Sequence, residues 1–277
     1  MRIKKGAEIT FPLQSCLIIS GDNVRQRVHN IIVAEEGSSA RILTGCALHP
    51  KVEGGEHLGL SEFFVRKNAT LNFTMIHNWA HDSMVRPRSA ANVEENAAFI
   101  SNYICLNPVR DIQMYPMAYL KGRGAAARLN SILYASKGSH MDVGGGIVLE
   151  EPGAKGEIIS RAIAAGNSQI TARGIIKGVA EDIKAHLECR GLLLDDDAVI
   201  HAIPELYGGK KEVDLSHEAA VGKIADKEIT YLMSRGLNEE EATSAIVRGF
   251  LDVDMMGLPD ELHGEVSSLI ENMTEGM

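Results

Sequence analysis

A short phrase returns about every 30 residues through the first two-thirds of the chain, and this repeat limits the possible folds more than any other feature. Each copy begins with an apolar residue, continues through two or three polar or charged residues to a Gly, Asn or Ala, and ends in alternating small and apolar residues. Successive copies begin 32, 28, 27, 29 and 30 positions apart. The six copies begin at Val33, Val65, Val93, Leu120, Leu149 and Val179. Such a period indicates structural units that stack on one another.

Within each unit the residues alternate as they do in a β-strand. Between Ala127 and Leu133, small and apolar residues occupy every second position. One unit alone cannot bury its apolar face, whereas stacked units bury it continuously. The repeat therefore predicts an all-β core, a parallel β-helix (solenoid) over residues 25–218. Residues 1–24 are expected to cap one end, and residues 219–277 to form a helical subdomain at the other.

Two other fold classes are disfavoured by what separates the strands. No helix long enough for a crossover lies between them, which argues against a doubly wound sheet. A β-sandwich needs antiparallel hairpins, and the chain contains no Asn-Gly or Asp-Gly turn to form them.

The pattern becomes helical after residue 218. Ile229, Leu232 and Met233 share one helix face, and Gly236 stands where a left-handed residue would end that helix. Asn238 and Glu241 have the spacing of a capping box at the start of a second helix. A third helix is expected from Leu258-Pro259, with its apolar face formed by Leu262, Val266, Leu269, Ile270 and Met273. This tail is interpreted as a docking device for a partner, a capping role being the alternative.

Composition excludes several classes of function. The net charge of −9 disfavours nucleic acid and anionic membranes as partners. No apolar run approaches the ~20 residues of a membrane span, and the first residues lack a signal-peptide pattern, so a cytoplasmic location is expected. No GxxxxGK[ST] motif occurs, so this chain is not expected to bind a nucleotide itself.

Paired carboxylates recur in the turns, as at Glu94 and Glu95, and are interpreted as solvated turn residues. The alternative is a carbohydrate-active β-helix enzyme that uses them for catalysis. A single Trp, Trp79, and the lack of a signal peptide argue against that alternative.

The four cysteines show no zinc-ribbon or disulfide spacing, and a small buried side chain is the simplest interpretation of each. Cys46 lies three residues before His49, and Cys189 follows Leu187 on the same strand face. Thiolate, imidazole and carboxylate groups are ligands of soft metals and iron–sulfur clusters. As candidate ligands we rank Cys189 first, Cys46 and Cys105 next and Cys16 last. His217 and Glu218 are adjacent, so in an extended strand they point to opposite faces.

The segments SHEAAVGKI, YLMSRGL, EEEA and IVRGF resemble the SufB/SufD family of iron–sulfur cluster assembly proteins, as do RPRSAA, ISRAIAAG and ARG upstream. The resemblance implies a right-handed parallel β-helix that pairs, through its last strands, with itself or a second SufB/SufD-type subunit. It also implies that the C-terminal helices bind SufC, an ABC-type ATPase. The residues expected to contact that ATPase are Tyr231, Met233, Arg235, Glu240 and Arg248.

By the same resemblance, His217 and Glu218 belong to the site of the nascent cluster. The cysteine of the B-type subunit would fall at about Gly208, where this chain has no thiol. The compact chain resembles a minimal, archaeal type of the family. The leading hypothesis is a non-enzymatic scaffold that carries a transient 4Fe-4S or 2Fe-2S cluster. Its expected metal ligands are Cys189, Cys46, Cys105 and Glu218, and nearby histidine or iron is expected to lower the cysteine pKa. A D-type structural partner without ligands of its own is the alternative within the family.

Overall fold

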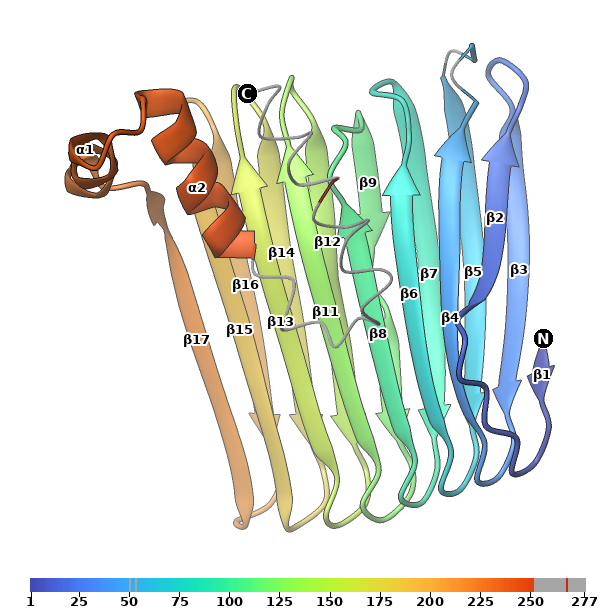
Figure 1. Cartoon of the computed structure of the whole chain (residues 1–277). Helices are drawn as coiled ribbons and strands as arrows, with labels where there is room; N and C mark the ends of the chain where they lie inside the picture. The colour runs from blue at the N-terminus through green and yellow to red at the C-terminus, as the bar shows by residue number, and fades with distance from the viewer. Residues whose placement is uncertain (50, 53, 252–267, 269–277) are drawn as a thin grey trace.

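The computed structural model describes residues 1–49, 51, 52, 54–251 and 268, which form a β-solenoid followed by two helices (Figure 1). Sheet A contains nine strands: β1 (Arg2–Ile3), β3 (Arg25–Ala34), β5 (Gly55–Val65), β7 (Ser83–Val93), β9 (Asp111–Met114), β10 (Met117–Leu120), β12 (His140–Leu149), β14 (Gln169–Gly178) and β16 (Val199–Gly208). Sheet B contains eight: β2 (Leu13–Ile19), β4 (Ser39–Leu48), β6 (Thr70–Asn78), β8 (Ala98–Cys105), β11 (Ala126–Ala135), β13 (Lys155–Ala164), β15 (Ile183–Leu193) and β17 (Val213–Lys223). The helices are α1 (Asp226–Ser234) and α2 (Glu239–Leu251).

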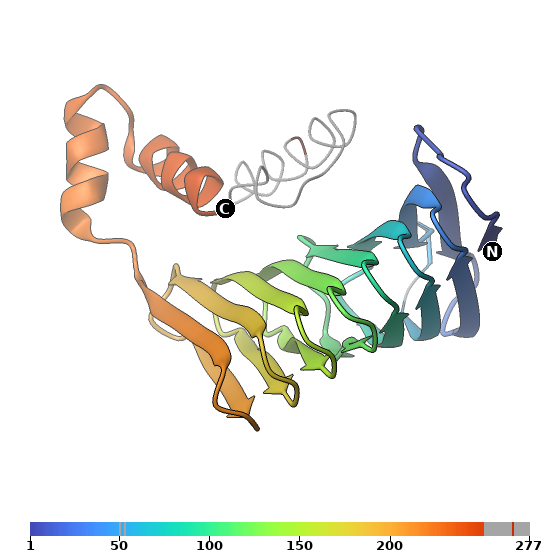
Figure 2. The same cartoon turned by 90° about the horizontal axis from the view of Figure 1, so that it is seen from below.

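The chain passes alternately through the two sheets, which form the two layers seen in Figure 2. Neighbouring strands within a sheet come from successive coils, as in the order β2, β4, β6, β8, β11, β13, β15, β17 of sheet B. The strand pairs of both sheets are parallel throughout the described residues. The predicted parallel β-solenoid is therefore confirmed.

The sequence repeat corresponds to the strand register of sheet A. Val93 pairs with Val65 on one side and with Leu120 on the other, and Leu120 pairs with Leu149. At the two ends the register is one residue away from the predicted copies, because Ala34 pairs with Val65 and Gly178 pairs with Leu149. The phrase thus marks the point where each coil leaves sheet A.

The turn that follows each of these strands contains one residue in the left-handed region, with φ between 52° and 75°. Gly, Asn and Asp adopt this region at the lowest cost, which explains why they recur in the repeat. The backbone N–H of each such residue donates a hydrogen bond to a carbonyl of the next coil, at 2.8–3.1 Å. The residues are Gly37, Asn68, Asn96, Gly124, Gly153 and Asp182. The stacked turns therefore continue the hydrogen-bonding of the sheets.

The interior between the sheets is filled by every second residue of each strand. One apolar cluster lies near the stacked turns and includes Leu71, Phe73 and Phe99. A second cluster lies further along the strands and includes Trp79 and Tyr103. Ala and Gly occupy many inward positions, so the two sheets approach closely and few aromatic residues are needed.

The stacked strands extend at both ends past the predicted limits of residues 25 and 218. β1 and β2 already pair with β3 and β4, and β17 continues to Lys223. Alternating apolar residues in β2, from Leu13 to Ile19, supply the inward face of a first coil.

The helix boundaries follow the predicted signals. Gly236 has φ of 106°, and its N–H and that of Leu237 donate to the carbonyls of Met233 and Leu232. The Asn238 side chain accepts from the Glu241 N–H at 2.9 Å, and the Glu241 carboxylate accepts from the Asn238 N–H at 2.7 Å. The capping box is therefore confirmed. The predicted helix from Leu258 lies outside the described residues.

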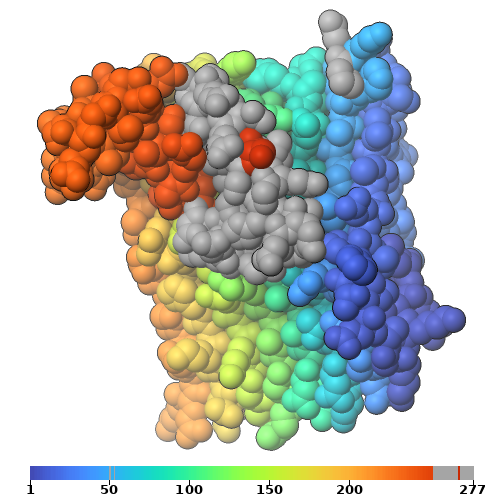
Figure 3. All heavy atoms as spheres, viewed as in Figure 1, coloured from blue at the N-terminus to red at the C-terminus, as the bar shows by residue number. Residues whose placement is uncertain are grey.

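The two helices differ in how they contact the solenoid. Val247 and Leu251 of α2 are buried against Ile132, Ile163 and Leu192 on the outer face of sheet B. By contrast, α1 buries none of its residues and projects beyond the last coil (Figures 2 and 3). Among the described helices, none is long and apolar enough to cross a membrane.

Candidate functional site

The C-terminal end of the solenoid presents His217 and Glu218 on its last strand. β17 pairs with β15 on one side and has no neighbour on the other among the described residues. Glu218 lies on the outer face, where its carboxylate accepts a hydrogen bond from Arg190 at 3.1 Å. Leu215 packs against the interior cluster, and strand alternation places His217 on that same inner face. The segment is an extended strand, as the prediction of opposite faces required.

Cys189 is the thiol of this end. It lies on β15 as the register partner of Ala219, with its side chain in the interior. The spacing of strands and residues puts its Cα about 8 Å from that of His217, diagonally across the sheet. Gly208, by contrast, ends β16 in the opposite sheet. Cys189 is thus the cysteine on the strand next to that of His217, on the same face of sheet B.

Burial raises the pKa of the Cys189 thiol to about 11, and the nearby Glu188 carboxylate raises it further while Arg161 lowers it. The expectation that nearby histidine lowers the cysteine pKa is not met here. The interior of the solenoid keeps this thiol protonated until a metal or another cation displaces the proton.

A chain of ion pairs on the outer face connects Cys189's strand to the last strand. Glu188 binds Arg161 of the preceding coil and lies 3.3 Å from Arg190, which in turn binds Glu218. The Arg161 and Glu188 side chains are only 6% and 12% exposed. The sequence analysis did not predict this series of ion pairs. The available signal was spacing, because Arg161 and Arg190 are register partners one coil apart, as are Glu188 and Glu218.

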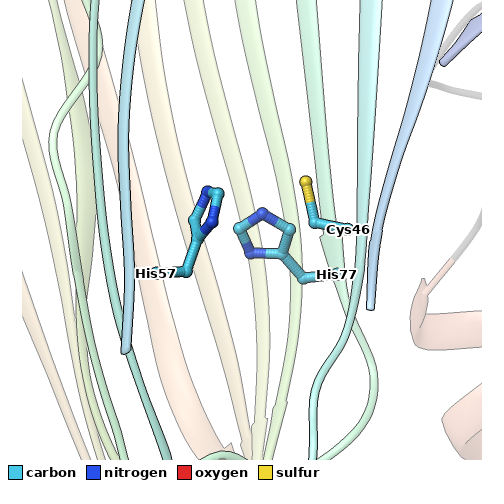
Figure 4. Close-up of side chains that lie close together, drawn as sticks. All are labelled: Cys46, His57 and His77. Carbon is cyan, nitrogen blue, oxygen red and sulfur yellow. The ribbon is translucent and has the colours of Figure 1, made fainter. Parts of the chain in front are cut away.

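A second group of ligating side chains lies inside the N-terminal half. His57 projects from β5 of sheet A, and Cys46 and His77 project from β4 and β6 of sheet B (Figure 4). One ligand atom from each of the three lies within 4.8 Å of the others. All three residues are buried, at 1–2% exposure. Cys46 and His77 are register partners, so the coil period brings them side by side.

Hydrogen bonds fix both imidazole rings. The Nδ1–H of His57 donates to the side-chain carbonyl of Gln26 at 2.8 Å, because that oxygen can only accept. Nδ1 of His77 lies 2.8 Å from the Tyr103 hydroxyl. Burial lowers the pKa of His57 to about 4, and burial with the neighbouring His57 lowers that of His77 to about 3. Both rings are therefore neutral at pH 7.

The thiols near these rings differ in their contacts. Burial raises the pKa of Cys46 to about 12, with a smaller contribution from Cys16. Cys105 belongs to the next coil, where its Sγ lies 3.7 Å from the Asn107 carbonyl and interacts with the Tyr103 hydroxyl. Cys105 is thus connected to the histidines through Tyr103 but is not one of the three grouped ligands.

His49, three residues after Cys46 in the sequence, is not part of this group. The Nδ1 of His49 accepts a hydrogen bond from the Lys51 N–H in the turn after β4, and His57 and His77 face Cys46 instead. The missed signal is again the coil period, because Cys46 and His77 are 31 positions apart.

The turn carboxylates form ion pairs with the neighbouring coils. Glu94 binds Arg66 at 2.5 Å and Glu95 binds Lys67 at 2.9 Å, on exposed turns. This arrangement agrees with their interpretation as solvated turn residues.

The family is decided by the match of its profile, described as "SUF system FeS cluster assembly, SufBD core domain", to residues 17–250. The chain belongs to the SufBD family. A SufBD family protein of Archaeoglobus fulgidus is 51% identical over 271 residues, which is 98% of this chain and 72% of the relative. That of Methanothermobacter thermautotrophicus (strain Delta H) is 48% identical over 277 residues, 100% of this chain and 68% of the relative. SufB of Bacillus subtilis is 33% identical over 279 residues, 99% and 59% respectively.

In this SufBD chain the five residues predicted to contact an ATPase lie on the two helices and the turn between them, and all five are exposed. Tyr231 and Met233 are large apolar side chains at 62% and 44% exposure. Glu240, at the start of α2, lines a cleft of about 700 Å³ between that helix and the turns that follow β11, β13 and β15.

Proposed function

We propose that this chain is a scaffold on which iron and sulfide are assembled into a cluster, and that it works as a pair joined at the last coil. The open edge at β16 and β17, which carries ligating side chains beside exposed apolar ones, is the observation that supports this proposal. Membership of the SufBD family agrees with it.

The argument for pairing begins with the edge itself. A terminal coil exposes unpaired backbone groups and a cross-section of the core, and proteins usually cover such edges. Here Leu206, Tyr207 and Val221 are exposed large apolar residues on the two final strands. The proposed occupant is a second copy of this chain or a second SufBD subunit.

The proposed ligands of the growing cluster are Cys189, His217 and Glu218. Iron is the substrate here, bound by a thiolate, an imidazole and a carboxylate. Cys189 must release its proton when its sulfur binds iron, because its pKa lies far above 7. Glu218 is held by Arg190, and pairing of two copies at this edge would bring one chain's outer-face carboxylate toward the ligands of the other.

Energy for opening the pair is proposed to come from an ABC-type ATPase. The sequence contains no phosphate-binding loop, so ATP hydrolysis would be supplied in trans. The proposed docking surface is formed by Tyr231, Met233, Arg235, Glu240 and Arg248, all exposed. Cluster assembly is proposed to take place in the cytoplasm, where thiols remain reduced. The four free cysteines agree with this location.

The test is anaerobic reconstitution of the purified chain, with and without a co-expressed ATPase, followed by iron and sulfide analysis. Cys189→Ser and His217→Ala are expected to lower cluster yield at least tenfold, whereas Cys16→Ser, an exposed thiol of the first coil, leaves the yield unchanged. Tyr207→Asp is expected to convert a pair into single chains in gel filtration. Unchanged cluster yield in Cys189→Ser would contradict the proposed ligand set. An ATPase complex without iron would instead favour the D-type structural role.

A further inference from the structure

The buried group of Cys46, His57 and His77 has a geometry that suits a metal ion. A tetrahedral ion with bonds of 2.0–2.3 Å holds its ligand atoms about 3.3–3.6 Å apart. The three ligand atoms already lie within 4.8 Å of one another, from three different strands. Small side-chain rotations would therefore complete the coordination.

The tautomer of His77 follows from the hydrogen-bond chain behind it. The Asn107 carbonyl can only accept, so the Cys105 thiol donates to it and its sulfur accepts from the Tyr103 hydroxyl. The Tyr103 oxygen then accepts from Nδ1–H of His77. Nε2 of His77 consequently carries a lone pair. It is buried and has no hydrogen-bond partner.

An orphaned lone pair at this depth is costly, because a buried acceptor without a donor loses its hydration. Metal coordination is the interaction that would satisfy it. The second ring has the same tautomer, since His57 donates from Nδ1 to Gln26 and keeps its lone pair on Nε2. Imidazole ligands that donate their other N–H to an oxygen are the usual arrangement at metal sites.

The backbone beside the site also makes room for His57. A Cβ at Gly59 would lie 2.9 Å from Nε2 of His57, closer than such contacts allow. A cavity of about 20 Å³ adjoins His57, Gly59 and Tyr103. This volume accommodates one water molecule beside the His57 ring.

We propose that Cys46, His57 and His77 bind one divalent transition-metal ion of the zinc or ferrous class. One thiolate and two neutral imidazoles select such ions over Mg²⁺ or Ca²⁺, which prefer oxygen ligands. On binding, the Cys46 S–H bond breaks, the sulfur bonds to the ion, and one proton leaves to solvent; no electron is transferred. The site lies on β4, β5 and β6, several coils from the open edge at β16 and β17. The proposed metal binding therefore does not depend on the proposed scaffold function.

The protein carries its own reporter of this event. Trp79 is the single tryptophan, and its ring centroid lies 5.1 Å from that of His57 and 5.6 Å from that of His77. An ion with a partly filled d shell, such as Co²⁺, quenches tryptophan emission at this range. Binding is therefore visible in the unlabelled protein.

The experiment titrates metal-free, reduced protein with Co²⁺ without oxygen. We expect one equivalent to quench Trp79, to give a near-ultraviolet thiolate-to-cobalt band with visible bands of tetrahedral cobalt, and to release one proton. Zn²⁺ and Fe²⁺ in separate arms are expected to compete, and the tighter of the two identifies the preferred ion. Mg²⁺ is expected to have no effect.

Variants separate this site from adventitious binding. Cys46→Ser is expected to abolish the thiolate band, and His77→Gln to weaken binding at least tenfold. Gln26→Ala, which removes only the acceptor behind His57, is expected to weaken binding 10–100-fold while keeping the band. Cys16→Ser is the control and keeps wild-type binding. Circular dichroism checks the fold of each variant.

Wild-type protein that gives no band, or a band that persists in Cys46→Ser, would overturn the proposal. So would equal affinity in wild type, Gln26→Ala and His77→Gln. If Cys46→Ser does not fold, Gln26→Ala and Gly59→Ala decide the question, because both leave the thiol in place. Loss of cluster assembly at the open edge would not alter any of these outcomes.

Discussion

The two halves of the solenoid hold their chemically reactive side chains in opposite ways. In the N-terminal half, Cys46, His57 and His77 are enclosed between the sheets and anchored by Gln26 and Tyr103. At the C-terminal end, His217 and Glu218 stand on a strand with one free edge. The same coil geometry therefore produces both a closed group and an open one. What differs is only whether another coil follows.

The enclosed group and the exposed group differ in how their polar side chains are held in place. In the closed group, hydrogen bonds within the chain hold Nδ1 of both rings, and Nε2 of His77 is buried without a partner. The open group has an ion-pair chain behind it, from Arg161 to Glu218, that orients the last strand without covering it. Three substitutions, described below from the largest expected effect on stability to the smallest, and one change of pH sharpen this contrast.

Among the substitutions, the largest effect is expected from Arg161→Ala, because it leaves Glu188, a nearly buried carboxylate, with only the more distant Arg190 as an ion-pair partner. We expect a loss of about 3–5 kcal/mol in the free energy of unfolding of the C-terminal coils. Urea denaturation measures the loss, and hydrogen exchange locates it in β13, β15 and β17. The double variant Arg161→Met with Glu188→Leu is the control and is expected to recover most of the stability. Equal losses in single and double variants would contradict a buried ion pair.

Acidification is expected to destabilise the N-terminal half. The folded-state pKa values of His57 and His77, about 4 and 3, lie below the ordinary value of 6.5, so the unfolded chain binds more protons. Their contribution is complete above about pH 6.5 and is lost as the pH falls toward 4, by up to roughly 3 kcal/mol for each ring. Melting curves of metal-free protein between pH 7 and 4 measure this. His77→Gln is expected to show a shallower pH dependence, and an unchanged one would exclude this cause.

The capping box gives a smaller, local effect. Asn238→Ala removes the side-chain acceptor of the Glu241 N–H and is expected to destabilise α2 by about 1 kcal/mol. Hydrogen exchange is expected to rise in α2 while the coils remain protected. Asn238→Asp keeps the acceptor and serves as the control. Increased exchange in sheet A would show that the tail supports the solenoid more widely.

Glu218→Gln is expected to change stability least. The Glu218–Arg190 pair is about half exposed, and such pairs contribute less than about 1 kcal/mol. The melting temperature is expected to stay near that of wild type, while iron retained after anaerobic reconstitution falls. An unchanged iron content would remove Glu218 from the ligand set. A large drop in melting temperature would mean that its role is structural.

Much of the fold was predictable because the residues of the repeat are determined by local backbone conformation. Gly and Asn in the turns adopt the left-handed conformation that each coil needs, and Val65, Val93 and Leu120 mark the strand ends. The signals at Gly236 and Asn238 are equally local, and both helix boundaries followed them. The ends of the solenoid were less predictable, since β1 and β2 carry no complete copy of the repeat.

The candidate sites were harder to predict, because they depend on which residues the coils stack together. Cys46 was identified, yet His57 comes from the other sheet, where no spacing in sequence gives its distance from the thiol. His77 and Glu188 were recoverable in principle, because a separation of one coil period makes strand neighbours. The burial of each side chain could not be predicted either, and burial is the main reason why the pKa of Cys46 is raised to about 12.

The stacking of parallel strands has one more consequence. Because every coil adds one strand to each sheet, the number of coils sets the axial distance between the enclosed histidines and the open edge, at about 4.8 Å per coil. The separation of the two groups is thus a whole number of coil spacings. Gain or loss of a whole repeat would lengthen or shorten the separation in fixed steps while leaving the chemistry at either position intact.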